Sequence, residues 1–324
     1  MPPLLEIDRL TVSFDNRRGP LTAVNGISLS VEAGEILGIV GESGAGKSIT
    51  GRAVMGLIEP PARIAGGEIR LEGRRIDNLD QRAMRHIRGA KIGAIFQDPL
   101  TSLNPVLTIG SQLVETIRAH LDVSPGQARE RALLLLREVG IPAPELRIDS
   151  YPHEFSGGMR QRAVIALALA AKPRLIIADE PTTALDVSVQ AQIIALFRRL
   201  SREHGTAIIL ITHDIGVIAE TASRMAVMYA GRIVELGSVE QVIRRPAHPY
   251  TSGLIAAIPT IQKRTERLVQ IDGVMPRLSD IPSGCAFHPR CASAVVRCQI
   301  EVPPDRYEGA SRVACWRYDG VTVQ

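Results

Sequence analysis

The sequence predicts an α/β fold with a mostly parallel β-sheet, an antiparallel pair of strands before it, a helical block and a cysteine-containing C-terminal extension. Between Ser156 and Thr212 the pattern runs helix, strand, helix, strand, which is typical of a parallel sheet covered by helices. After Gly237 this alternation stops, and proline-rich and cysteine-bearing segments follow. We interpret this last part as an appended extension.

The N-terminal region predicts two strands, then a strand, a glycine-rich loop and a helix. Leu4–Phe14 and Thr22–Val31 alternate apolar and polar side chains on either side of a turn, which predicts an antiparallel pair. The run EILGIVG is apolar after its first residue and ends in glycine, as expected for a buried strand. ESGAGKS follows directly, and ITGRAVMGLI then has helical spacing.

The middle of the chain predicts a strand and two helices. KIGAIFQDP has strand character, and Ile109–Leu121 and Pro125–Val139 have helical periodicity. The second helix has Ser124 as its N-cap and Pro125 at its first position, two residue types that favour a helix start. A short helix is predicted near Tyr250–Ile258.

Composition excludes few classes of protein. The 324 residues are enough for a large core and suggest about two domains. No apolar run approaches the roughly 20 residues of a membrane span, and the N-terminus lacks a secretory signal, so we expect a cytosolic location. Lys and Arg number 38 against 34 Asp and Glu, and aromatic residues make up only 3 %, which argues against stacking platforms for single-stranded nucleic acid.

The segment GESGAGKS fits the phosphate-loop pattern, in which glycines let backbone N–H groups surround phosphates. Lys47 would reach the outer phosphates and Ser48 would hold Mg²⁺. The alternative is an ordinary glycine turn, which the strand before and the helix after disfavour. The predicted nucleotide-binding segment comprises Gly41, Glu42, Ser43, Gly44, Ala45, Gly46, Lys47, Ser48 and Ile49.

The run LIIADE ends a predicted strand with two carboxylates. Asp179 would orient Mg²⁺ through water, and Glu180 would polarise the attacking water. The alternative is a strand end with solvated acids. A phosphate loop earlier in the chain favours the magnesium site, because a nucleotidase needs both parts.

The run SGGMRQ at Ser156 begins a helix with two glycines, so its N–H groups could meet a phosphate without obstruction by Cβ atoms. The alternative is an N-cap serine after a loop. Gln97 follows a strand, an ALD motif spans Ala184–Asp186, and His213 ends the strand TAIILIT. With these motifs in this order, the chain resembles the ATP-binding cassette (ABC) family over about residues 4–240.

This resemblance implies an ABC-type phosphate-loop NTPase core. Residues 1–98 and 160–240 would form the nucleotide-binding core, a RecA-like part plus an antiparallel β subdomain. Residues 99–159 would form a helical subdomain that carries the signature motif, and residues 241–324 the extension.

The resemblance also implies roles for single residues. Lys47 and Glu180 would act in hydrolysis, His213 would contact the γ-phosphate, and Gln97 would sense the metal that Ser48 and Asp179 hold. An aromatic residue stacks on adenine in the family, and Phe14 is the candidate; the alternative is a core residue of the first strand.

Two cassettes stack head to tail in this family. Ser156, Gly157 and Gly158 would therefore cap the ATP on a partner's phosphate loop, and Asp186 would line the same seam. The sequence departs from the family at Met159, where the usual signature has glutamine. The serine and both glycines remain, so we expect function to be retained. His153, His204 and His248 lack motif support, and we interpret them as surface or turn residues.

The four cysteines lie in the extension, at Cys285, Cys291, Cys298 and Cys315. In a reducing cytosol, clustered cysteines more often bind metal than form disulfides. Four thiolates suffice for a tetrahedral zinc or an iron–sulfur cluster. Gaps of five, six and sixteen residues are wider than those of zinc ribbons, but spacing alone leaves zinc, a cluster and unligated thiols open.

The stretch from HPYTSGLIAAIP to PSGCAFHPRC resembles the C-terminal extension of dipeptide and oligopeptide importer ATPases, several of which carry a [4Fe–4S] cluster there. This resemblance implies such a cluster at the four cysteines, with Zn²⁺ as the alternative. The implied role of the cluster is to hold the extension together, and redox sensing is the alternative role.

The function implied is that of an ATPase subunit that energises import of dipeptides or oligopeptides. The implied partners are a second, similar ATPase subunit in a heteromeric pair, two transmembrane permease subunits and an extracytoplasmic peptide-binding protein. The implied location is the cytoplasmic face of the inner membrane. Alternatives are another solute, such as nickel complexes, and a soluble ABC ATPase acting on DNA or ribosomes; the single phosphate loop disfavours the latter, and we expect no nucleic-acid partner.

Overall fold

The computed structural model describes residues 2–17, 19–183, 185–258 and 270–319. Ala184 of the predicted ALD motif lies outside the described residues. The chain divides into two compact units: unit 1 contains Met1–Val31, Ile36–Asp77 and Ile211–Gln324, and unit 2 contains Glu32–Glu35 and Asn78–Leu210. In the described ranges, no helix is both long and apolar enough to cross a bilayer.

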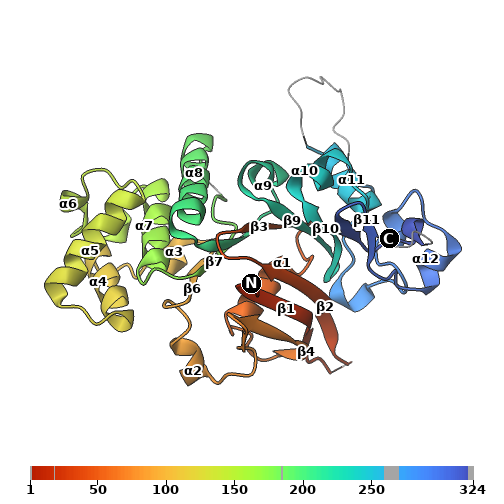
Figure 1. Ribbon diagram of the computed structural model, residues 1–324, viewed down its shortest axis with the longest axis horizontal. Helices are drawn as coiled ribbons and strands as arrows, with labels where there is room; N and C mark the ends of the chain where they lie inside the picture. Colours follow the sequence, from red (N-terminus) through yellow and green to blue (C-terminus); the bar gives the residue numbers. More distant parts are fainter. Residues whose placement is uncertain (1, 18, 184, 259–269, 320–324) are drawn as a thin grey trace. The chain divides into compact units, whose positions relative to one another are not determined.

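Unit 1 contains a four-stranded antiparallel sheet with strand order β2-β1-β4-β5 (Figure 1). Its strands are β1 (Leu5–Phe14), β2 (Leu21–Val31), β4 (Ala62–Leu71) and β5 (Arg74–Arg75). The antiparallel pairing of β1 with β2 confirms the pair predicted from alternation. β4 was not predicted, because its sequence ARIAGGEIRL has two central glycines and weak alternation, and its pairing with β1 supplies the missing stabilisation.

The second sheet of unit 1 places its strands in the order β11-β12-β10-β9-β3. The strands are β3 (Ile36–Val40), β9 (Arg224–Tyr229), β10 (Arg232–Ser238), β11 (Arg306–Glu308) and β12 (Ser311–Val313). β3 is buried at all five residues and runs parallel to β9, which agrees with the predicted buried parallel strand. The helices of this unit are α1 (Lys47–Val54), α9 (Ile215–Thr221), α10 (Val239–Arg244), α11 (Pro249–Ala256) and α12 (Val296–Ile300).

Unit 2 contains three strands in the order β8-β7-β6 and a set of helices. β6 (Ile92–Ile95) and β7 (Leu175–Asp179) are parallel, and β8 (Ala207–Ile211) follows β7 in the chain. The helices are α2 (Gln81–Arg85), α3 (Pro99–Ser102), α4 (Ile109–His120), α5 (Pro125–Glu138), α6 (Pro144–Arg147), α7 (Gly157–Leu169) and α8 (Val187–His204). The parallel pairs and these helices confirm the predicted α/β class.

The predicted helical block forms as α4 and α5, which pack on each other and on α7 (Figure 1). α5 begins where its sequence predicts. The Ser124 hydroxyl accepts a hydrogen bond from the Gln127 N–H at 3.3 Å, and the Ser124 N–H donates to Gln127 Oε1 at 2.9 Å. This reciprocal capping box satisfies two N–H groups that a helix start leaves without partners.

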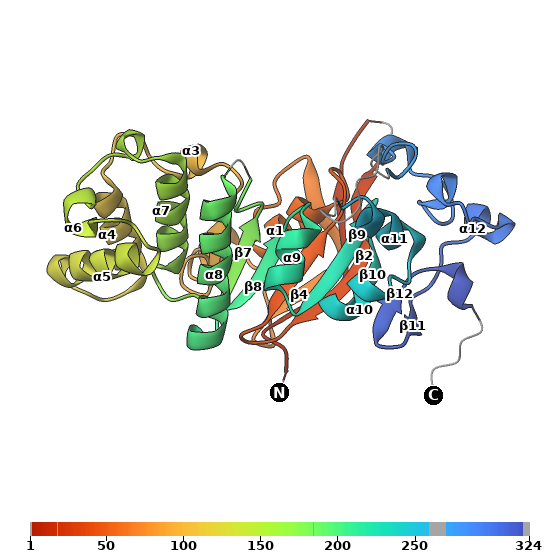
Figure 2. The same cartoon turned by 90° about the horizontal axis from the view of Figure 1, so that it is seen from above.

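The C-terminal extension has more regular structure than its sequence predicts. β11 and β12 form a hairpin, and β12 pairs antiparallel with β10, with Val313 opposite Glu235 (Figure 2). β12 has only three residues, too few for a local pattern to identify. Pairing with a strand far away in the sequence stabilises it, which sequence periodicity does not report.

A buried polar cluster joins β10 to α11. Glu235 is fully buried, and its two carboxylate oxygens accept hydrogen bonds from the N–H groups of Ala247 and His248, each at 2.9 Å. His248 is only 1 % exposed and caps α11, because its Nδ1 accepts from the Tyr250 N–H at 3.0 Å. The expectation of a surface position for His248 was therefore wrong, although the residue does occupy the turn before a helix.

Burial lowers the pKa of His248 to about 3, below the usual value of about 6.5. Between these two values the unfolded chain binds a proton that the folded chain does not, so stability falls as the pH drops. We expect the wild type to lose about 1 kcal/mol more than His248→Asn between about pH 7 and about pH 5.5, measured by denaturant unfolding. Asparagine can still cap the helix but does not titrate, and identical pH dependence of the two proteins would contradict this assignment.

Candidate functional site

The glycine-rich segment forms a tight loop between β3 and α1 in unit 1. Gly41 has φ +153° and Gly46 has φ +101°. A Cβ atom at Gly41 would lie 2.3 Å from the Met228 carbonyl oxygen, and one at Gly46 would lie 2.9 Å from the Ala23 carbonyl oxygen. Only glycine fits this backbone path, because any side chain would meet another main chain.

Lys47 is the first residue of α1 and is 6 % exposed. Its ammonium group donates to the carbonyl oxygens of Gly41 at 2.8 Å and Glu42 at 3.0 Å, so it lies across the loop. The N-cap of α1 is Gly46, which has no side chain to accept from the first N–H groups. A buried ammonium and a helix N-terminus in one loop are what a polyphosphate requires. Ser48 follows in the first turn and is partly exposed.

Unit 2 brings Gln97 and Glu180 together. Glu180 follows β7 and has φ +50°, a left-handed conformation that is uncommon for a non-glycine residue. One of its carboxylate oxygens accepts from Gln97 Nε2 at 3.0 Å and from the Thr183 hydroxyl at 3.0 Å. Strained backbone of this kind is concentrated at functional sites. The carboxylate is held in one orientation, as a general base requires. Asp179, one residue earlier, ends β7.

The predicted signature motif forms the N-terminus of α7. Ser156 is its N-cap and accepts from the Met159 N–H at 3.3 Å. Both interpretations of this serine are therefore compatible, because it caps the helix and also lies exposed at the end of the helix dipole. A Cβ atom at Gly157 would meet no neighbour within 4 Å. Met159 contributes its main chain to the cap, so a change of side chain there leaves the cap intact.

Asp186 lies near this motif within unit 2. It is the N-cap of α8 and accepts from the Val189 N–H at 2.9 Å and the Ser188 hydroxyl at 2.7 Å. The hydrogen bond from Ser188 lowers the pKa of its carboxyl group. A Cβ atom at Gly158 would lie 3.1 Å from the Val189 side chain, so the starts of α7 and α8 are neighbours. The family resemblance implies that Asp186 and this motif line one seam, and that role stays a prediction.

His213 and Phe14 belong to unit 1. His213 is exposed and follows β8, directly before Asp214, whose carboxylate accepts from Gly216 and Val217 N–H groups as the N-cap of α9. Phe14 is the last residue of β1, pairs with Leu21 and Ala62, and is partly exposed. Its predicted contact with adenine remains a prediction.

All four cysteines line one small cavity of about 90 Å³, together with aromatic residues. None of them forms a disulfide, and the Cys285 N–H donates to the Cys298 carbonyl oxygen at 2.8 Å. Burial, together with a smaller effect of the three other thiols, raises the pKa of Cys285 to about 11. Across the part of the chain that the structure describes, no three His, Cys, Asp or Glu side chains converge as ligands of one metal ion.

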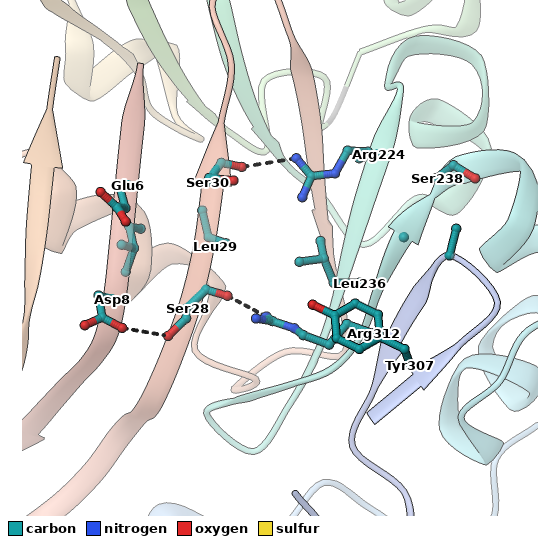
Figure 3. A pocket seen from close by; sticks show the side chains of 13 residues that line it. Glu6, Asp8, Ser28, Leu29, Ser30, Arg224, Leu236, Ser238, Tyr307 and Arg312 are labelled. Atoms are coloured by element: carbon teal, nitrogen blue, oxygen red, sulfur yellow. Dashed lines mark hydrogen bonds between the residues drawn. The ribbon is translucent and has the colours of Figure 1, made fainter. Parts of the chain in front are cut away.

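A larger cavity of about 530 Å³ lies elsewhere in unit 1 (Figure 3). It is lined by β1, β2, β10 and the β11–β12 hairpin, and it contains none of the predicted site residues. Arg312 donates to the Ser28 carbonyl oxygen and Arg224 to the Ser30 carbonyl oxygen. These bonds tie the extension and β9 to β2.

Three residues near the motifs were not predicted. Thr183 donates to Glu180, whereas Tyr250 and Arg290 both bond to Glu42 of the glycine-rich loop. Arg290 is adjacent to Cys291 in the sequence, and Tyr250 lies in the predicted short helix. Nothing in the sequence around Tyr250 and Arg290 indicates a contact with a loop more than 200 residues away.

Comparison with known proteins agrees with this geometry. Residues 24–183 match the family model described as "ABC transporter", and residues 234–298 match that of the "Oligopeptide/dipeptide transporter, C-terminal region". The dipeptide transport ATP-binding protein DppD of Escherichia coli is 47 % identical over 300 residues, which are 93 % of this chain and 92 % of that protein. The oligopeptide transport ATP-binding protein OppD of Bacillus subtilis is 49 % identical over 307 residues, with 94 % and 86 % covered.

Solved structures give the same result for the fold. The ATP-binding cassette MJ0796, in a dimeric post-hydrolysis state bound to ADP and Pi, has a TM-score of 0.66 and 28 % identity, covering 72 % of this chain and 98 % of that one. The structure of cbiO1 from Clostridium perfringens, part of an ABC transporter complex, has a TM-score of 0.65 and 26 % identity, with 76 % and 92 % covered. With a glycine-constrained loop between strand and helix, a strained carboxylate after a parallel strand and relatives that match over almost its whole length, the chain belongs to the ABC transporter family of ATPases.

Proposed function

We propose that this protein is the ATP-hydrolysing subunit that energises import of dipeptides or oligopeptides through a membrane ABC transporter. The observation that carries the proposal is the identity of 46–49 % to dipeptide and oligopeptide transport ATP-binding proteins over almost the whole chain. The match of residues 234–298 to the C-terminal region of such transporters supports peptides as the solute.

In the nucleotide-bound state, the loop Gly41–Ile49 surrounds the phosphates of ATP. Lys47 would move its hydrogen bonds from the loop carbonyl groups to the outer phosphate oxygens. Ser48 and Asp179 would hold Mg²⁺, Gln97 would sense it, and Phe14 would contact the adenine. When bound, Mg²⁺ would supply positive charge that stabilises the phosphates.

In the hydrolytic step, Glu180 accepts a proton from water. The water oxygen attacks the γ-phosphorus, the bond to the bridging oxygen breaks, and ADP and phosphate are released. The hydrogen bonds from Gln97 and Thr183 hold the Glu180 carboxylate while this happens. His213 contacts the γ-phosphate.

The assembly follows from the same relationship. Ser156, Gly157, Gly158 and Asp186 face a second, homologous ATPase subunit, and MJ0796, a relative of similar fold, is itself dimeric. Residues 99–159 serve as the helical subdomain and residues 241–324 as the extension. Two permease subunits and an extracytoplasmic peptide-binding protein complete the transporter, with this chain on the cytoplasmic face of the membrane.

The four cysteines hold a [4Fe–4S] cluster in this proposal. A tetrahedral zinc is the alternative, and with Zn–S bonds of about 2.3 Å it would place the four sulfurs within about 3.8 Å of each other. Four unpaired thiols around one cavity suit a larger cluster, in which each thiolate binds its own iron. Burial raises the pKa values of Cys285 and Cys315, so a cationic group between the cysteines would favour ionisation of these two thiols.

Gly41→Ala tests the loop. We expect the affinity for a fluorescent ATP analogue with Mg²⁺ to fall by about tenfold or more, because the added methyl group would meet the Met228 carbonyl oxygen. Gly126→Ala is the matched control, since Gly126 lies in α5 and a Cβ atom there would meet nothing within 4 Å. Equal affinities of the two variants would refute the role of the loop.

Glu180→Gln tests the hydrolytic step and the transport function. We expect ATP binding and pairing of the ATPase subunits to persist while hydrolysis falls by about 100-fold or more, because the amide cannot accept the proton of water. The readouts are phosphate release and ATP-dependent uptake of labelled dipeptides and longer peptides by the complex isolated from native membranes. Steady turnover by the variant would remove Glu180 from this role, and uptake of neither peptide class by the wild-type complex would overturn the proposed solute.

Anaerobically purified protein tests the cluster. We expect a brown protein with iron and inorganic sulfide each in about fourfold ratio to the chain, and loss of both in Cys298→Ser. Colourless protein with one zinc per chain would assign the four cysteines to zinc instead.

A further inference from the structure

Glu42 brings a negative charge into the loop proposed to bind phosphates. It is the second residue of GESGAGKS, and its side chain is 28 % exposed. Phosphate groups carry the same sign of charge, so an uncompensated carboxylate here would weaken nucleotide binding. A positive group that compensates the charge of Glu42 is therefore needed.

Arg290 of the C-terminal extension pairs with that carboxylate. Its Nη1 lies 3.1 Å from both carboxylate oxygens of Glu42, and its side chain is only 7 % exposed. A pair with so little access to water is screened much less than an exposed one. The exposed pair Arg244–Glu240 in α10, 76 % and 73 % exposed, provides the contrast within this chain.

Further contacts hold the guanidinium group in this position. Its Nε donates to the Asp272 carbonyl oxygen at 2.8 Å and its Nη2 to the Ile271 carbonyl oxygen at 3.3 Å. It also lies over the rings of Tyr229 and Phe287, at 5.8 Å and 6.0 Å from their centroids. Three parts of unit 1 outside the loop thus hold one cation against Glu42.

The main chain of Glu42 is held by the same region. Its N–H donates to the Tyr250 hydroxyl at 2.9 Å, and Tyr250 is fully buried in α11. Tyr250 packs edge-on against Tyr229, with ring centroids 4.6 Å apart. Residues from beyond the cassette core therefore fix both the amide and the carboxylate of one phosphate-loop residue.

The position of Arg290 depends on the turn between two of the cysteines. The Cys285 carbonyl oxygen accepts from the His288 N–H at 2.9 Å and is 3.0 Å from His288 Nδ1. Arg290 then ends a short 3₁₀ helix, and the Cys291 N–H donates to the His288 carbonyl oxygen at 3.2 Å. The cysteine cavity and the phosphate loop are thus joined by a segment of a few residues.

We propose that Arg290 is a positioning residue for nucleotide binding: it cancels the charge of Glu42 in the phosphate loop, and the four-cysteine segment sets its place. This inference rests on the proposed role of Gly41–Ile49 as the phosphate loop. It makes nucleotide affinity dependent on the folded state of the extension.

Removing the charge on each side of the pair tests the role of Arg290. With the full chain, Mg²⁺ and a fluorescent ATP analogue, Arg290→Ala should raise the Kd by about tenfold, because Glu42 is left unpaired beside the phosphates. Glu42→Gln should lower the Kd, because Arg290 then adds an uncompensated positive charge. The double variant should return to within about threefold of the wild type. A double variant that binds as weakly as Arg290→Ala would overturn the charge argument, and a Glu42→Gln variant that binds more weakly would do so even if Arg290→Ala failed to fold.

Ionic strength and two controls separate this role from a loss of structure. In Arg290→Ala the Glu42 carboxylate, already 28 % exposed, loses the side chain that covers it and becomes open to salt, so the defect should shrink between about 50 mM and about 300 mM salt, whereas an equal defect at both concentrations would refute charge neutralisation. Arg244→Ala should leave the Kd unchanged. Lys47→Ala distinguishes the two proposals. If Lys47→Ala abolishes binding while Arg290→Ala changes nothing, only the role of Arg290 is refuted. If Lys47→Ala binds like the wild type, the proposed phosphate loop is refuted.

The dependence on the cysteine segment has its own test. Cys291→Ser, with its iron content measured in parallel, should raise the Kd in the wild-type background by several-fold. In the Glu42→Gln background it should raise the Kd much less, because the charge that Arg290 cancels is gone. An equal increase in both backgrounds would refute transmission through Arg290.

Discussion

The close approach of the loop after β3 to the neighbouring main chain is the constraint on which the site depends. Gly41 and Gly46 adopt positive φ angles where a Cβ atom would collide with carbonyl oxygens of Met228 and Ala23. The buried Lys47 ammonium lies across this loop, because it donates to the Gly41 and Glu42 carbonyl oxygens. Because the glycine backbone rather than flexible side chains sets this path, the loop is organised in advance for the nucleotide that we propose it binds.

A second constraint is local strain at the carboxylate end of β7. Glu180 holds a left-handed backbone conformation, and Gln97 and Thr183 fix its carboxylate. Such strain costs about 1–3 kcal/mol and persists only where surrounding structure compensates for it. The buried, parallel β6–β7 pair before it provides that support. Glu180 is thereby held in one orientation at the end of a strand.

The C-terminal extension contacts the glycine-rich loop directly. Glu235 accepts hydrogen bonds from N–H groups just before α11, and His248 caps that helix. Tyr250 in the helix bonds to the loop. Arg290 reaches the same loop from the cysteine segment. Each of these polar groups is buried with a partner, as buried polar groups must be. The extension and the phosphate loop therefore share one hydrogen-bonded network.

The sequence by itself determined the elements that have a strong local pattern. The β1–β2 pair, the apolar strand β3, the capping box of α5, the glycine positions of the loop and the carboxylates after β7 all follow from periodicity, capping or turn chemistry acting over a few residues. The family resemblance followed from the order of these motifs. The roles of single residues toward ATP, and of the cysteines toward a cluster, remain predictions.

Only the tertiary structure decided which distant residues meet. β4 and β12 form because partner strands far along the chain complete them, and His248 is buried although an arginine pair and two prolines lie close to it in the sequence. The bond between Gln97 and Glu180, the adjacency of α7 and α8 and the pairing of Arg290 with Glu42 have no local signature. Contacts of this kind depend on side-chain packing across the folded chain, whereas a sequence pattern records only the preferences of neighbouring residues.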